Sequence, residues 1–256
     1  MGQLRRDEYA AALPTFSAGP HAGKHAVYEH EKFHAWITAK GSLHVQPLDA
    51  GKPVGKPFSC WSVSPYYSAK GTTYGRRVAD FQEFGQPVVI PSKGGSIRIS
   101  GRLVEEIPFT VEYTFEGNTI KARGGCRDRP STKPSTTFRL ITQFAATHRF
   151  SAETPTAQIA AATKGMTLEA RLADGKSSKT YPYWQGLRGI AGPCSAMIVR
   201  GVFHPRVITF KPTGRTGRLQ GYIYTGRRLC QGYYLAYTTQ GKKIALSDTE
   251  ATMIIE

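Results

Sequence analysis

The sequence has no acidic residue between Asp174 and Asp248, although twelve Lys and Arg residues fall in that span. The chain of 256 residues carries a formal net charge of +16, and residues 129–256 hold 18 Lys and Arg against six Asp and Glu. Unless folding brings acids over from the first half, such a surface attracts polyanions. The alternative is a dispersed, solvated charge without a polyanionic partner. The predicted partner is therefore an anionic polysaccharide or another polyanion.

Long apolar runs are also missing. None approaches the roughly 20 residues of a membrane-spanning helix, so we expect no membrane span. The first six residues, Met1–Arg6, contain no apolar core of a signal peptide. Two localisations stay open: an extracytoplasmic one, favoured if a signal has been removed, and otherwise a cytoplasmic one.

Cysteines are few and widely spaced, and they form no CxxC pair, so a zinc ribbon is not expected. Four of them allow three disulfide pairings, but a chain of this length can equally bury them as free thiols. Their pairing stays open for all four: Cys60, Cys126, Cys194 and Cys230.

Apolar residues alternate with polar ones along most of the chain, which is typical of half-buried strands. The clearest case runs over 109–115, turns at Gly117 and continues over 119–123, as in a β-hairpin. Turns recur every 8–15 residues or so, and helix signals are thin. The pattern predicts an all-β fold with little helix: a large antiparallel β-sandwich of jelly-roll or supersandwich type.

We expect one sandwich domain over 21–256 after an N-terminal tail at 1–20; the alternative is two β domains divided near 152–163. Short helices are predicted at Arg5–Leu13 and Ala157–Thr163. The Pro-rich segment Gly51–Tyr74 is predicted as a long loop, as is Gly124–Ser135.

One short motif matches a known chemical pattern. His30-Glu31-Lys32-Phe33-His34 fits H-E-x-x-H, which on a helix places two His on one face to bind zinc. The following residues, 35–38, favour a strand instead, and no third ligand is marked. We therefore expect no cofactor and no stoichiometric zinc. In the strand interpretation His30 and His34 still share a face, although with a different reach. Trp36 and Thr38 lie on the face of His34, and His44 could lie across from them.

Catalytic signatures are otherwise absent. There is no Gly-x-Ser-x-Gly elbow, no phosphate-binding loop and no dinucleotide fingerprint. Whether the protein is an enzyme stays open. If it cleaves a polysaccharide, a lyase that neutralises a uronate carboxylate with Arg and uses Tyr or His as base and acid fits best. The candidate residues for this chemistry are His148, Tyr183, Arg188 and His204.

Aromatic and basic residues cluster in two places, where rings could stack on a flat ligand and guanidinium groups could hold carboxylate, sulfate or phosphate. The predicted ligand-binding residues are Trp61, Tyr66, Tyr67, Arg76, Arg77, Tyr181, Tyr183, Trp184 and Arg188.

The composition therefore favours a carbohydrate-associated β-sandwich that binds or cleaves an anionic polysaccharide. The alternative is a nucleic-acid or general polyanion binder without catalysis, and the third interpretation is a zinc hydrolase acting through His30 and His34. The ligand and the oligomeric state are open.

Overall fold

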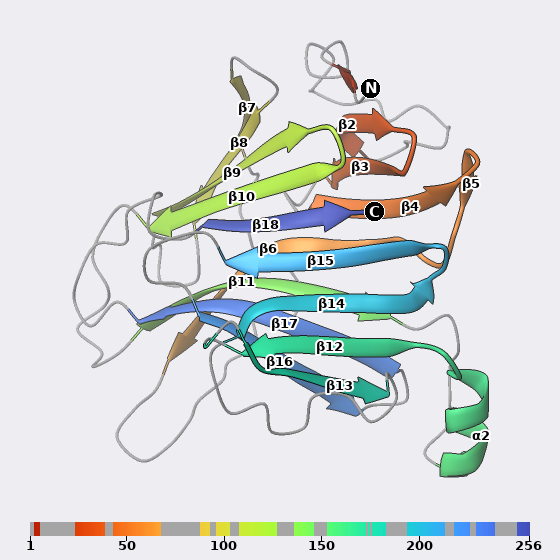
Figure 1. The fold of residues 1–256 in the computed structure, drawn as a ribbon. Coiled ribbons are helices and arrows are strands. Elements are labelled where there is room, and N and C mark those ends of the chain that lie inside the picture. The colour runs from red at the N-terminus through yellow and green to blue at the C-terminus, as the bar shows by residue number, and fades with distance from the viewer. Residues whose placement is uncertain are drawn as a thin grey trace.

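The computed structural model of the protein describes residues 3–5, 24–38, 43–67, 88–92, 96–102, 108–126, 136–145, 153–172, 174, 176–182, 194–212, 218–225, 229–238 and 250–256. Almost all regular structure in these residues is β-strand, and the helix among them is α2 (Thr156–Ala162) (Figure 1). The predicted all-β fold is confirmed, as is the two-turn helix near Ala157–Thr163. Within the described residues, no helix is long and apolar enough to span a membrane.

The first sheet, called sheet 1, is antiparallel throughout, with the strand order β1–β2–β3–β4–β6–β11–β17–β16. Its strands are β1 (Gln3–Arg5), β2 (Lys24–His30), β3 (Phe33–Thr38), β4 (Leu43–Asp49), β6 (Phe58–Tyr67), β11 (Thr136–Ala145), β16 (Arg218–Thr225) and β17 (Leu229–Thr238). The two-residue strand β5 (Lys52–Pro53) pairs with the end of β4.

The second sheet, sheet 2, is also antiparallel and has the order β7–β8–β9–β10–β18–β15–β14–β12–β13. Its strands are β7 (Val88–Ser92), β8 (Ser96–Arg102), β9 (Pro108–Glu116), β10 (Thr119–Cys126), β12 (Thr167–Leu172), β13 (Ser178–Pro182), β14 (Cys194–Phe203), β15 (Arg206–Pro212) and β18 (Glu250–Ile255). Among the described residues, the pair of Cys194 with Leu219 joins this sheet to sheet 1 at one corner.

The two sheets lie one behind the other as the layers of a sandwich (Figure 1). Aromatic side chains meet between the layers. The rings of Tyr28 and Phe115 stack with centroids 4.8 Å apart, and those of Phe58 and Phe203 lie 5.2 Å apart. One buried hydrophobic cluster contains residues of both sheets, from Tyr28 to Ile255. The predicted antiparallel β-sandwich is therefore confirmed.

Alternation along the strands decides which side chains enter this core. In β9 the side chains of Val111, Tyr113 and Phe115 are buried, and those of Glu112 and Thr114 lie on the other face. The predicted hairpin at 109–123 is formed as β9 and β10, with Gly117 at a φ of 54° in the turn. A left-handed backbone conformation of this kind costs glycine little.

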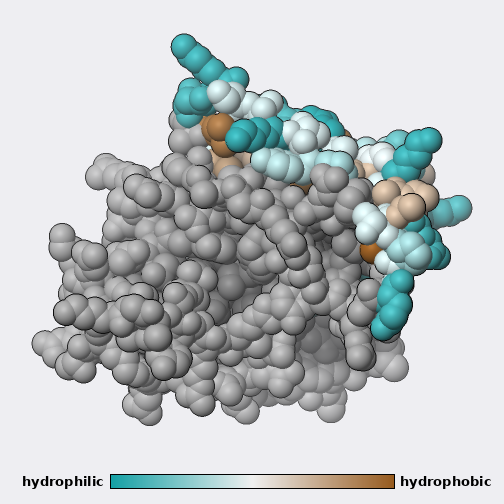
Figure 2. Space-filling view, turned by 90° about the horizontal axis from the view of Figure 1, so that it is seen from below, coloured by the Kyte–Doolittle hydropathy of each residue, from teal (hydrophilic) through white to brown (hydrophobic). Residues whose placement is uncertain are grey.

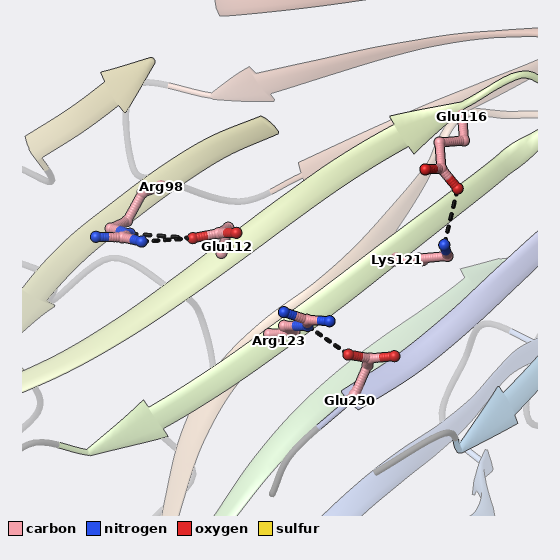
Figure 3. Close-up of polar contacts among 6 residues, drawn as sticks. All are labelled: Arg98, Glu112, Glu116, Lys121, Arg123 and Glu250. Carbon is pink, nitrogen blue, oxygen red and sulfur yellow. Dashed lines mark hydrogen bonds and ion pairs between the residues drawn. The ribbon is translucent and has the colours of Figure 1, made fainter. Parts of the chain in front are cut away.

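The outer face of sheet 2 carries a ladder of alternating charge across four adjacent strands (Figure 3). Arg98 on β8 donates two hydrogen bonds to Glu112 on β9, at 2.7 and 3.1 Å. Arg123 on β10 lies beside Glu112 in the register and donates to Glu250 on β18. Opposite charges in direct cross-strand register stabilise the pairing of the strands.

One part of the sequence folds differently from the prediction. The segment Gly51–Tyr74 was predicted as a loop because it contains three prolines, yet β5 and β6 lie within it. Pro65 lies inside β6 and faces Phe138 of β11 in the register, whereas β4 pairs with residues 58–60 at the start of the same strand. The prediction was wrong because Pro lowers strand preference locally, whereas tertiary pairing decides whether the strand forms.

Other predicted boundaries are partly covered by the described residues. Arg5, the first residue of the predicted helix Arg5–Leu13, lies in β1, and residues 6–13 lie outside the described residues. In the predicted loop Gly124–Ser135, residues 124–126 belong to β10.

Seen from below, the side on which β13 and α2 lie, most described surface residues are hydrophilic (Figure 2). In β13 every residue except Tyr181 is exposed.

Candidate functional site

The H-E-x-x-H segment forms a tight β-hairpin and not a helix. β2 ends at His30, Glu31 and Lys32 form a two-residue turn, and β3 begins at Phe33. In the register His30 faces Phe33, and Glu29 faces His34. Because facing residues of an antiparallel pair share a sheet face, His30 lies on the core face with the buried Phe33.

The two histidines therefore lie on opposite faces of sheet 1. The ring of His30 packs 5.5 Å from that of Phe33, and His34 belongs to the outer face. The sequence-based expectation that the two would share a face in a strand was wrong, because the turn at Glu31 and Lys32 interrupts the strand. They cannot converge on one zinc ion, which contradicts the zinc-hydrolase interpretation. Among the described residues, no group of three His, Cys, Asp or Glu side chains could hold a metal ion.

The outer face of sheet 1 holds His34 and Trp36 on β3, and across from them Gln46 and His44 on β4. The rings of Trp36 and His44 stack with centroids 5.8 Å apart and an angle of 30° between their planes. The predicted placement of His44 across from the His34 and Trp36 face is confirmed. All four side chains are half-buried.

At the turn end of these strands lies an open depression of about 470 Å³. We call it the hairpin depression. Three polypeptide segments supply its lining: the β2–β3 turn with the start of β3, the β4–β5 turn, and the first residue of β15. The lining residues are Glu31, Lys32, His34, Leu48, Ala50, Gly51 and Arg206.

A chain of hydrogen bonds connects these segments. The Lys32 N–H donates to Nδ1 of His30 at 3.2 Å, and the Leu48 N–H donates to the Lys32 carbonyl at 2.7 Å. Arg206 donates from Nε to the Leu48 carbonyl at 2.6 Å and from Nη2 to Asp49 at 3.3 Å. Because both backbone groups of Lys32 are held in this way, the β2–β3 turn and the β4–β5 turn are fixed relative to each other.

The β4–β5 turn has an unusual backbone. Ala50 has a φ of 46°, and it is the only residue other than glycine with a positive φ among the described residues. Gly51 follows with a φ of 77°, so both central residues of this two-residue hairpin turn are left-handed, as a type I′ turn requires. A left-handed alanine is strained, and such strain is concentrated at functional sites.

The charges of the lining are mixed. Lys32 and Arg206 are cations and Glu31 is an anion, while Asp49 beside Arg206 is half exposed. Within the described residues, neither the Lys32 ammonium nor the Glu31 carboxylate has a hydrogen-bond or ion-pair partner. Burial lowers the pKa of His30 below its ordinary value, and the nearby charges of Lys32 and Arg206 act in the same direction. At neutral pH His30 is therefore neutral, as its role as a hydrogen-bond acceptor requires.

The predicted ligand-binding residues are only partly covered. Trp61, Tyr66 and Tyr67 lie on β6, but their side chains are outside the described part. Tyr181 lies on β13 and packs partly buried against the core. The remaining residues of this set lie outside the described residues: Arg76, Arg77, Tyr183, Trp184 and Arg188.

The other catalytic candidates are not brought together in the described residues. His148 lies outside them, and His204 is exposed in the turn between β14 and β15. His204 does not line the hairpin depression, although Arg206 two residues later does. The residues that sequence reasoning missed are Arg206 and the turn Leu48–Gly51. Nothing local marks Arg206, because its partners are 157 and 158 residues away in sequence.

In the described residues, two cations of the acid-free span find partners through folding. Arg206 pairs with Asp49 at 3.3 Å, and Arg200 lies 3.7 Å from Glu169, which also pairs with Arg171. Lys179 and Lys211 have no ion-pair partner in the described residues. Cys194 is buried, and burial raises the pKa of its thiol. The side chains of Cys60, Cys126 and Cys230 lie outside the described part.

Comparison with known proteins gives only distant structural likeness. No protein-family model matches the sequence, and no curated protein matches it significantly. A galactose mutarotase related enzyme from Lactobacillus acidophilus is 9% identical, with a TM-score of 0.49, covering 90% of this chain and 96% of its own. The Slr1438 protein from Synechocystis is 8% identical, with a TM-score of 0.49 and coverage of 88% and 92%.

A 4-alpha-glucanotransferase from Thermococcus litoralis is 12% identical with a TM-score of 0.41, and the match covers 90% of this chain and 39% of that one. At such identities and TM-scores, no function or site residue can be transferred to this chain.

Proposed function

We propose that this protein binds an acidic saccharide in the hairpin depression. The observation that carries the proposal is the lining itself, which combines the donors Lys32 and Arg206 with the carboxylate of Glu31 and the imidazole of His34 in one open hollow. Saccharide hydroxyls both donate and accept hydrogen bonds, so a site with both kinds of partner suits them.

The walls of the depression support the proposal because they are fixed before a ligand arrives. The hydrogen bonds from Leu48 to Lys32 and from Arg206 to Leu48 hold the two turns together. A preorganised site loses less conformational entropy on binding, which raises affinity for the same contacts. The strained backbone of Ala50 lies in the same wall.

An aromatic surface lies next to the depression. Trp36 is two residues beyond His34 on the same face of β3 and is stacked on His44. Flat apolar ring faces are suitable surfaces for the C–H face of a sugar. A saccharide of several units would extend from the depression along the outer face of sheet 1 toward this pair of rings.

The preference for an acidic saccharide is supported by charge. The chain carries a net charge of +16, and the two cations of the lining outnumber its one carboxylate. Arg206 is already paired with Asp49, so the Lys32 ammonium is the stronger candidate partner for a ligand carboxylate. A charge-assisted hydrogen bond of this kind is worth about 1.5–3 kcal/mol.

The test is titration calorimetry with tetragalacturonate, neutral maltotetraose and single-stranded oligothymidylate. We expect tetragalacturonate to bind, and Lys32→Gln to weaken its binding roughly tenfold, or about 1.4 kcal/mol. Lys179→Gln is the matched control, because it removes the same charge from an exposed residue on β13.

Equal losses in the two variants would mean diffuse polyanion attraction without a site. Binding of the oligonucleotide in preference to tetragalacturonate would favour the nucleic-acid alternative. Maltotetraose binding as tightly as tetragalacturonate would remove the preference for an acidic ligand.

A further inference from the structure

The β2–β3 turn depends on a hydrogen bond that only neutral His30 can accept. Nδ1 of His30 receives the N–H of Lys32, two residues later, at 3.2 Å. Asn and Asp side chains often make this same bond to the residue two positions on, in Asx turns. Here an imidazole makes it, so the acceptor exists only while Nδ1 is unprotonated.

This bond is the first of a series that ends at Arg206. The carbonyl of Lys32 accepts from the Leu48 N–H at 2.7 Å, and the Leu48 carbonyl accepts from Arg206 at 2.6 Å. A change at His30 therefore acts on the peptide that presents Glu31 and Lys32, and through it on the opposite wall of the depression.

Protonation of His30 would remove the acceptor and place a cation next to the turn. In the described part of the chain, the charged groups around the ring are Glu31 and Lys32 on its own hairpin and Arg206 on β15. Of these, Glu31 favours the protonated ring, while Lys32 and Arg206 oppose it, as does burial of the ring. The protonated state therefore favours separation of the turn from its neighbours.

We propose that His30 is the positioning residue of the hairpin depression, and that its protonation releases the β2–β3 turn and weakens ligand binding in mildly acidic solution. This inference rests on the proposed function, and it adds a regulation of the same site. His30 itself touches no ligand, because it lies on the core face of sheet 1 with Phe33.

The direction in which affinity changes with pH distinguishes release of the β2–β3 turn from a simple change in the charge of the protein. Protons taken up on acidification make a protein more positive as a whole. By itself, this would strengthen the binding of an anion. A loss of affinity on acidification therefore requires a structural cause such as release of the turn.

The experiment measures tetragalacturonate affinity between about pH 8 and pH 5.5, where its carboxylates stay ionised because carboxyl pKa values lie near 3.3–4.3. We expect the wild-type affinity to fall roughly tenfold over this range. In His30→Asn the amide oxygen replaces Nδ1 and does not titrate, so the affinity should stay level or rise. In His30→Gln the oxygen lies one carbon farther out, so binding should be weak throughout the range.

A wild-type affinity that rises on acidification would overturn the inference and leave the proposed function standing. The same holds if His30→Asn keeps the wild-type fall, or if His30→Gln binds as well as His30→Asn. No binding at any pH would overturn the proposed function.

Amide hydrogen exchange tests the turn without a ligand. The protection factor of the Lys32 amide should fall between about pH 8 and pH 5.5 in the wild type, because protonation of His30 removes the acceptor of the Lys32 N–H. It should not fall in His30→Asn. Equal protection at both pH values in the wild type would refute the switch.

Discussion

Gly201 lies on β14 where this strand passes directly over the turn between α2 and β12. Its φ is 77°, and a Cβ atom added to it would lie 2.3 Å from the carbonyl oxygen of Gly165 and 2.9 Å from its carbonyl carbon. Both atoms belong to backbone, so no side chain can rotate away. We therefore expect Gly201→Ala to move one of the two backbone segments.

The expected cost has two parts. A left-handed conformation costs an alanine about 1–2 kcal/mol, and overpacking a site that cannot yield costs a further 1–3 kcal/mol or so. The free energy of unfolding should therefore fall by about 2–5 kcal/mol. For a chain of this size the melting temperature should drop by roughly 5–15 °C. Thermal and urea unfolding followed by circular dichroism measure both quantities.

The chain supplies matched controls for the two parts. Gly51 has the same φ of 77° and Gly165 a φ of 81°, yet a Cβ atom at either would meet nothing within 4 Å. Gly51→Ala and Gly165→Ala should therefore lose only the conformational part, about 1–2 kcal/mol. If Gly201→Ala lost no more stability than these two variants, the close approach of β14 to the turn would be refuted.

Two further predictions concern the β4–β5 turn and the charge ladder. Ala50→Asn should raise the free energy of unfolding by about 0.5–1 kcal/mol, because Asn-Gly is the preferred pair of a type I′ turn and Asn tolerates the left-handed φ of 46° found here. Urea unfolding measures this change. An unchanged or lower stability would argue against a strained Ala50. A double-mutant cycle with Arg98→Ala and Glu112→Ala should give a coupling free energy of about 0.5–1 kcal/mol. The coupling should shrink in high salt, because the Arg98 side chain is 40% exposed and solvent screens the ion pair. A coupling near zero at low salt would contradict a contribution of this ion pair to stability.

Much of the fold could be predicted because strand formation left a local signal. The alternation over 109–115 and 119–123 predicted β9 and β10, and that over 33–37 predicted the shared face of His34 and Trp36. The prediction failed at Pro65, where pairing with β11 supports a strand that local preference disfavours. It also failed at His30 and His34, where a two-residue turn reversed the face of the second histidine.

The candidate site could be predicted only in part. His34 stood out in the sequence because of its motif, but Arg206 had no signal. Its partners Leu48 and Asp49 come from the opposite end of the chain and meet it only because sheet 2 packs on sheet 1. The predicted aromatic and basic cluster at Tyr181–Arg188 stays a prediction, since only Tyr181 of its proposed residues is described and it packs against the core.

The sequence by itself determined the class of fold and the charge of the protein, because alternation acts over neighbouring residues and charge is a sum over the chain. Only the tertiary structure decided which residues share a face or a hollow. Burial of the two inner sheet faces sets the order of the strands, and that order brings Lys32, Leu48 and Arg206 into one hydrogen-bonded chain. Such long-range contacts form when the core closes, so no local pattern in the sequence contains them.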